Sequence, residues 1–169
     1  MQRALTALAS ATLTLGVLSP AAFAQTGAQT GAQTDIPLDE VPADILAMAE
    51  TTVPGVAFHR VSTEFENGGV VYEFEAFNSA GKHVEVDITE DGAIQEIEME
   101  IAFDQTPSRV KAALEEAASG FTPDYVEYSV RDGGRAYVYE FEGDYNGRAL
   151  EVEIAENGRV LFVSDGSVG

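Results

Sequence analysis

The chain contains an internal repeat, and this repeat restricts the fold more than any other feature of the sequence. Residues 42–97 align with residues 107–163 at an offset that drifts between 65 and 67 residues. The strongest match pairs Val71-Tyr72-Glu73-Phe74-Glu75 with Val138-Tyr139-Glu140-Phe141-Glu142. Drift by one or two residues is expected where copies differ in loop length. We therefore expect two copies of one supersecondary unit.

Each copy is expected to begin with an amphipathic helix. Pro42 and Pro107 each suit the first turn of a helix, where the missing N–H is not needed. The apolar stripe that follows is spaced for one helical face. In the first copy it comprises Ile45, Met48, Ala49, Thr52 and Val53, and in the second Val110, Ala113, Leu114 and Ala117.

The rest of each copy alternates with period two, which is typical of strands. The expected strands are 56–65, 70–77, 83–89 and 93–101 in the first copy, and 125–130, 135–142, 148–155 and 159–164 in the second. Turns such as Asp91-Gly92 and Asn157-Gly158 favour tight antiparallel hairpins. The expected fold is therefore α+β, with two tandem α-β-β-β-β repeats and helices packed on one face of the sheet or sheets. The short connection at 100–107 favours one continuous sheet, with two sheets as the alternative.

Residues 1–24 have the order of a secretory signal peptide. Arg3 precedes an apolar run, and Ala22-Phe23-Ala24 supplies the small residues of a cleavage site. We expect cleavage after Ala24 and a periplasmic or secreted product. Residues 25–36, rich in Gln, Thr, Gly and Ala, are expected to be a flexible tether. The two repeats then occupy residues 37–101 and 102–169.

Composition limits the partners of the chain. Its net charge is −20, which becomes −21 once Arg3 is removed with the signal peptide. Nucleic acid is therefore a disfavoured partner, and no apolar segment after the signal peptide is long enough for membrane insertion. A partner with a basic surface is favoured instead, with weakly bound divalent cations as a second class of partner. The chain has no cysteine, which excludes disulfides and thiolate metal sites.

Alternation also assigns the two faces of the expected sheet. Tyr72, Phe74 and Ala76 point to one face, which the helices can cover. The opposite, exposed face carries four carboxylates from each copy. These candidate partner-binding residues are Glu73, Glu75, Glu85, Asp87, Glu140, Glu142, Glu151 and Glu153. Screening by water and salt could make this face a merely solubilising surface, and attraction to lysines and arginines of a partner is the functional alternative.

These features resemble the PepSY and PepSY-like domains, including the tandem arrangement of beta-lactamase-inhibitory-protein-like chains. The resemblance rests on a leading helix, Tyr72-Glu73-Phe74-Glu75, Gly81, the Asp91-Gly92 turn and their counterparts from Tyr139 onward. It implies a non-catalytic module that binds or inhibits other proteins, often exported enzymes such as peptidases. The chain lacks the cysteines and tryptophans expected of the lactamase inhibitor itself, so no target or contact residue is carried over.

The leading functional hypothesis is therefore an exported, non-catalytic protein-binding module that inhibits or regulates an envelope or secreted enzyme. The alternative is a calcium- or magnesium-binding or envelope-sensing protein that uses the acidic face. No cofactor, catalytic residue or metal ligand is assigned. His59 and His83 lack the spacing of a zinc motif and are expected to be polar surface residues. Regular alternation along a strand explains the acidic pair Glu85 and Asp87, so the pair is not assigned a catalytic role. The segment 87–92 lacks the ligand spacing of an EF-hand calcium loop.

Overall fold

The computed structural model describes residues 33–66 and 68–164. The expected signal peptide and most of the expected tether lie outside these residues. The helices are α1 (Ala43–Thr52) and α2 (Ser108–Ala117), and short 3-10 turns precede them at Leu38–Glu40 and Phe103–Gln105. The strands are β1 (Thr34–Asp35), β2 (Phe58–Glu66), β3 (Gly69–Phe77), β4 (His83–Thr89), β5 (Ile94–Glu100), β6 (Tyr125–Arg131), β7 (Ala136–Asp144), β8 (Ala149–Ala155) and β9 (Val160–Ser164).

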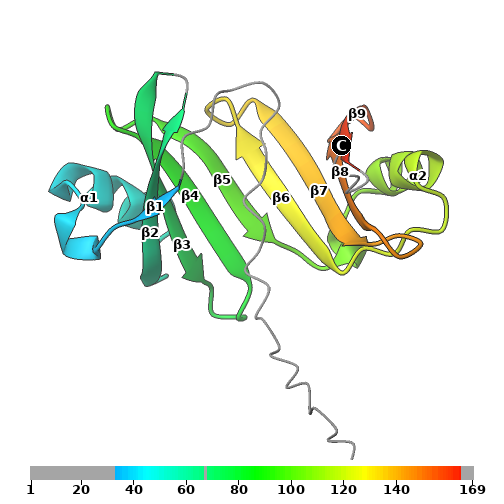
Figure 1. Cartoon of the computed structure of the whole chain (residues 1–169), viewed down its shortest axis with the longest axis horizontal. Helices are drawn as coiled ribbons and strands as arrows, with labels where there is room; N and C mark the ends of the chain where they lie inside the picture. Colours follow the sequence, from blue (N-terminus) through cyan, green and yellow to red (C-terminus); the bar gives the residue numbers. More distant parts are fainter. Residues whose placement is uncertain (1–32, 67, 165–169) are drawn as a thin grey trace, which may run out of the picture.

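All described strands form one antiparallel sheet in which each strand pairs with the next along the chain (Figure 1). The junction at the middle of the sheet joins β5 to β6, with Glu96 opposite Arg131 and Glu100 opposite Glu127. The four strands that follow α2 therefore extend the sheet formed by the four strands that follow α1. The prediction of one continuous sheet is confirmed, and the alternative of two separate sheets is wrong.

Glycines with left-handed backbone close the tight turns between strands. Gly92 between β4 and β5 has φ 84°, and Gly158 between β8 and β9 has φ 87°. A residue with a Cβ atom is strained at such angles, whereas glycine adopts them readily. The repeated Gly residues of the sequence therefore set where the chain reverses direction.

Each helix packs on an apolar cluster of the sheet. Ile45 and Ala49 of α1 are buried in a cluster with Phe74, Val86 and Ile88. A second cluster joins Val110 and Leu114 of α2 to Phe141, Val152 and Ile154. Strand register places the sheet residues of both clusters on the same side of the sheet. Within the described residues, neither helix is long and apolar enough to cross a membrane.

The last residues of the expected tether form strand β1. Thr34 and Asp35 pair with Thr63 and Ser62 of β2, and Arg60 donates a hydrogen bond to Asp35 at 2.8 Å. A two-residue strand is too short to produce a period-two pattern, so composition alone gave no sign of it. The chain is therefore held at the edge of the sheet from Thr34 onward, two residues before the expected end of the tether.

Candidate partner-binding face

The side of the sheet opposite the two helix clusters carries carboxylates on every strand from β3 to β8. We call this side the acidic face. All eight residues singled out in the sequence lie on it, directly opposite one another in cross-strand pairs. The pairs are Glu73 with Asp87, Glu75 with Glu85, Glu140 with Glu153, and Glu142 with Glu151. Like charges facing one another in this way destabilise a sheet unless something neutralises them.

The acidic face is more buried than alternation predicts. Glu140 is 1% exposed, and Glu73, Glu75, Asp87 and Glu153 are also buried. The expectation that all eight residues are exposed is therefore wrong. The physical reason is that carboxylates of this face contact side chains from neighbouring strands, as Glu140 and Glu153 contact Arg131, and alternation along a single strand does not show such contacts. The remaining three residues are partly exposed: Glu85, Glu142 and Glu151.

The two predicted groups are separated by strands β5 and β6, whose residues complete the acidic face. These residues were not singled out in the sequence: Glu96, Glu98, Glu100, Glu127, Ser129 and Arg131. They occupy alternate positions along β5 and β6, so the alternation that found the outer groups could also have found them. What it could not show is that β5 and β6 are neighbours, which makes the acidic face continuous across the sheet.

Arg60 neutralises the end of the acidic face near β1. Its guanidinium forms ion pairs with Glu75 and, at 2.6 Å, with Asp35. Next to it, Glu73 accepts hydrogen bonds from Ser62, at 2.8 Å, and from the side chain of Gln33. One cation and two neutral donors therefore contact this pair of glutamates.

His83 lies inside the acidic face and is 9% exposed. The expectation that it is a polar surface residue is therefore wrong, whereas His59 is exposed. Nδ1 of His83 lies 3.3 Å from Oε1 of Glu127, and Nε2 lies 3.7 Å from Oε2 of Glu75. Contact with Glu127, followed by contact with Glu75, raises the pKa of His83 to about 10. The imidazole is therefore a cation at neutral pH.

Arg131 neutralises the other half of the face. Its guanidinium pairs with Glu96, with Glu140 at 2.5 Å and with Glu153 at 3.2 Å. These three partners come from β5, β7 and β8, so one side chain connects four neighbouring strands. Arginine suits this position because its planar group offers several donors in fixed directions. One positive charge nevertheless faces three carboxylates.

Several carboxyls of the acidic face are held partly in their neutral form. Burial, followed by repulsion from neighbouring glutamates, raises the pKa of Glu85 to about 8 and that of Glu142 to about 7. Burial raises the pKa of Glu140 to about 9 in spite of the attraction of Arg131. Burial also raises the pKa of Asp87 and Glu98 well above its usual range. The acidic face therefore carries protons at neutral pH, and its charge changes between pH 5 and pH 9.

Comparison with known proteins supports the resemblance seen in the sequence. The model of the family described as "PepSY: Peptidase propeptide and YPEB domain" matches residues 42–98, which run from the start of α1 into β5. A comparison with curated proteins found no match.

Solved structures extend the likeness across the sheet. A BLIP-like protein of Bacteroides fragilis superposes with a TM-score of 0.58 at 18% identity, covering 76% of this chain and 88% of that one. A DUF2874 family protein of Bacteroides uniformis superposes with a TM-score of 0.59 at 16% identity, covering 76% and 93% of the two chains. At these identities the likeness shows the fold. The chain therefore resembles PepSY domains in its first half and BLIP-like proteins in its architecture, as its sequence predicts.

Proposed function

We propose that the chain is an exported, non-catalytic module that binds another exported protein through the acidic face. The proposed partner has a basic surface and is an enzyme of the envelope or of the secreted fraction, such as a peptidase, which the module inhibits or regulates. The observation that carries the proposal is the continuous acidic face, which no described helix covers. The match to a family described by peptidase propeptides supports the same class of partner.

The architecture supports this proposal through the distribution of charge. Both helices pack on the opposite side of the sheet, so neither α1 nor α2 lies over the acidic face. Within it, Glu142 and Glu151 are partly exposed at the β8 side, and Glu85 is partly exposed near the middle. Lysine and arginine side chains of a partner could reach these three carboxylates. Complementary charge of this kind speeds association and selects the partner.

We also propose that the two α-β-β-β-β segments are tandem copies of one module, 37–101 and 102–169, behind a cleaved signal peptide. The element order and the two helix clusters support this arrangement, since α1 and α2 pack on corresponding phenylalanines, Phe74 and Phe141. Two joined copies present twice the sheet surface of one. The purpose of the duplication is, in this proposal, a face wide enough for a protein partner.

The experiment that tests the proposed function is capture of a partner from envelope extract, followed by its identification. The bait is the mature chain, and the comparison is a variant with Glu142→Gln and Glu151→Gln. A matched control carries Glu50→Gln and Glu116→Gln, which remove the same charge from exposed positions on the helices. We expect one identified basic protein to bind the mature chain and the control, to be released by salt, and to bind the face variant weakly. Equal binding by both variants would contradict the proposal.

A further inference from the structure

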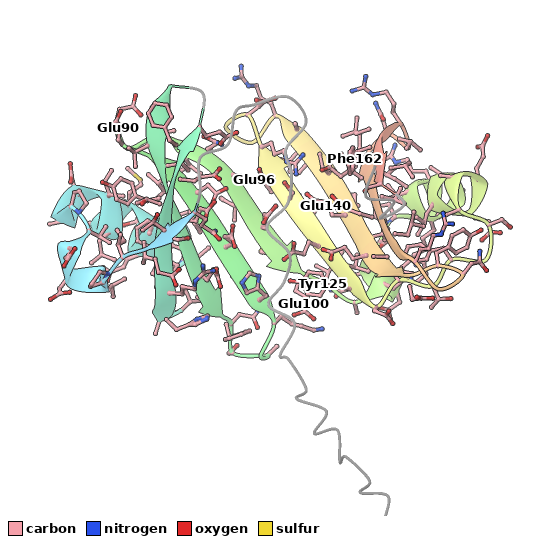
Figure 2. All side chains as sticks on the ribbon, in the orientation of Figure 1. Glu90, Glu96, Glu100, Tyr125, Glu140 and Phe162 are labelled. Carbon is pink, nitrogen blue, oxygen red and sulfur yellow. The ribbon has the colours of Figure 1, made fainter. Side chains whose placement is uncertain are left out.

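Three glutamates converge at the middle of the acidic face. Glu96 and Glu98 of β5 and Glu140 of β7 each place a carboxylate oxygen within 4.8 Å of the others. Glu96 and Glu140 are labelled in Figure 2, where both lie at the middle of the sheet. Strand β6 runs between β5 and β7, so these side chains meet across a whole intervening strand.

Ser129 explains how the glutamates can meet. It lies on β6 directly opposite Glu98 and is fully buried. Adjacent strands are about 4.8 Å apart, so β5 and β7 are separated by about 10 Å. A small side chain at position 129 leaves room above β6 that the longer glutamate side chains from both flanking strands can enter. Ser129 also donates a hydrogen bond to Glu96.

Two of the three carboxylates offer oxygens that no other group among the described residues contacts. Glu140 is 1% exposed, and its Oε2 has no hydrogen-bond partner within the described residues. Glu98 is 7% exposed, and within the same residues neither a hydrogen bond nor an ion pair reaches it. A buried carboxylate oxygen without a donor is costly, and such atoms in a native structure call for a proton, a water molecule or an ion.

Arg131 does not satisfy this cluster. Its guanidinium contacts Glu96, Oε1 of Glu140 and Glu153, so a single positive charge is shared among three carboxylates. In the part of the chain that the structure describes, no cation pairs with Glu98. If these four glutamates, Glu98 and the three partners of Arg131, are all ionised, their charges and that of Arg131 sum to −3. A divalent cation would reduce this to −1. Protons can compensate the same charge, and burial already raises the pKa of Glu98 and Glu140.

We propose that Glu96, Glu98 and Glu140 bind a hard divalent cation, with calcium as the preferred ion. The donors are all oxygens, which suits calcium and magnesium and disfavours the softer transition metals. Calcium binds oxygens at about 2.4 Å, so two ligands on opposite sides of the ion are about 4.8 Å apart. The spacing of the three carboxylates therefore accepts calcium without movement of the strands. Magnesium requires a tighter octahedron and dehydrates less readily, so it should bind more weakly.

The test is calorimetric titration of the mature chain with calcium chloride at pH 8, after treatment with chelator. Thermal melting with and without calcium provides a second measurement. We expect one calcium ion per chain, a rise in melting temperature, and weaker binding of magnesium. Binding should weaken at pH 5, because protons then occupy the same carboxylates. Sodium chloride at equal ionic strength should not reproduce the effect.

Two variants distinguish a specific calcium site from non-specific attraction of cations to the acidic face. Glu98→Gln removes one proposed ligand and keeps its shape, whereas Glu142→Gln removes a charge from the same face outside the cluster. Loss of an outer partner of a metal ligand typically costs about 10- to 100-fold in affinity, so loss of a ligand should cost at least about tenfold. The Glu142→Gln variant should retain its affinity within about twofold.

The absence of calcium-specific heat in the mature chain would overturn the proposal. Equal weakening of calcium binding by Glu98→Gln and Glu142→Gln would also overturn the proposal. That result would indicate that calcium is attracted by the overall charge of the acidic face and not by one site. Circular dichroism in the absence of calcium shows whether Glu98→Gln folds. Because this substitution removes a repelling buried carboxyl, we expect a folded variant at least as stable as the original chain. The outcome of the calcium titration does not depend on whether a protein partner is found.

Discussion

Nδ1 of His83 lies 3.3 Å from Oε1 of Glu127, although the two residues belong to strands β4 and β6, which are not neighbours. The contact therefore passes over β5 and links the strands that follow α1 to those that follow α2. Glu127 also accepts a hydrogen bond from the hydroxyl group of Tyr125 at 2.5 Å. These contacts help to explain why Glu127 is only 1% exposed.

The first prediction concerns this link. The substitution His83→Ala removes a buried cation and leaves Glu127 and Glu75 without it, so we expect destabilisation by about 2–3 kcal/mol at pH 7. The control His59→Ala changes an exposed ring and should cost less than about 1 kcal/mol. Urea unfolding followed by circular dichroism measures both. Equal effects of the two substitutions would contradict a structural role for the His83 contacts.

The second prediction concerns pH. In the folded chain the pKa is raised to about 8 for Glu85, about 9 for Glu140 and about 10 for His83. The folded chain therefore binds more protons than the unfolded chain between about pH 4.5 and pH 10, so stability falls as pH rises through this range.

At lower pH, carboxylates with a lowered pKa dominate the pH dependence, and stability falls as pH falls. The pKa of Glu75 is lowered, chiefly by its contact with His83, and the stability that this provides is lost below about pH 4.5. We expect the melting temperature to be highest near pH 5 and to decline steadily toward pH 9. Thermal melting scans across this pH range measure the melting temperature. A melting temperature that rises between pH 5 and pH 8 would show that the buried carboxyls are not held in the neutral form.

The third prediction concerns Arg131. The substitution Arg131→Gln leaves three buried carboxylates without their cation, and removal of one partner from such a cluster costs about 3–5 kcal/mol. Because protons can replace the lost charge, the cost should be smaller at pH 5 than at pH 8. Arg135 is exposed, and Arg135→Gln should change stability by less than about 0.5 kcal/mol. A cost for Arg131→Gln that is independent of pH would mean that packing, and not charge, is the role of this side chain.

The fourth prediction concerns cooperativity. Because β5 and β6 join the two halves in one sheet, we expect the described part of the chain to unfold in a single transition. Phe74 and Phe141 are fully buried in the separate helix clusters, and Phe74→Leu or Phe141→Leu should each lower the midpoint of that same transition. Differential scanning calorimetry provides the measurement. Two transitions, each sensitive to only one substitution, would contradict this view.

Much of the fold could be predicted because its information is local. Period-two alternation located the strands after both helices, and glycines such as Gly92 and Gly158 marked the reversals. Apolar spacing identified Ile45 and Leu114 as buried helix residues. Strand β1 was missed because two residues carry no periodicity.

The candidate site was harder to predict because it depends on neighbours across strands. Alternation placed Glu140 on the correct face, but its ion pair with Arg131 of the adjacent strand cannot be predicted from one strand. His83 looked like surface because its partner Glu127 is 44 residues away in the sequence. The convergence of Glu98 and Glu140 requires both the β5–β6 pairing and the small side chain of Ser129. No pattern along a single strand contains this information.

The proposed binding of a basic protein to the acidic face is tested by the association rate of the identified partner. We expect this rate to fall at least about tenfold between 25 mM and 300 mM sodium chloride, because the salt screens charge steering. Glu142→Gln with Glu151→Gln should lower both the rate and its salt dependence, whereas Glu50→Gln with Glu116→Gln should leave both nearly unchanged. An association rate that does not depend on salt, or that the two double variants alter equally, would contradict binding through the acidic face.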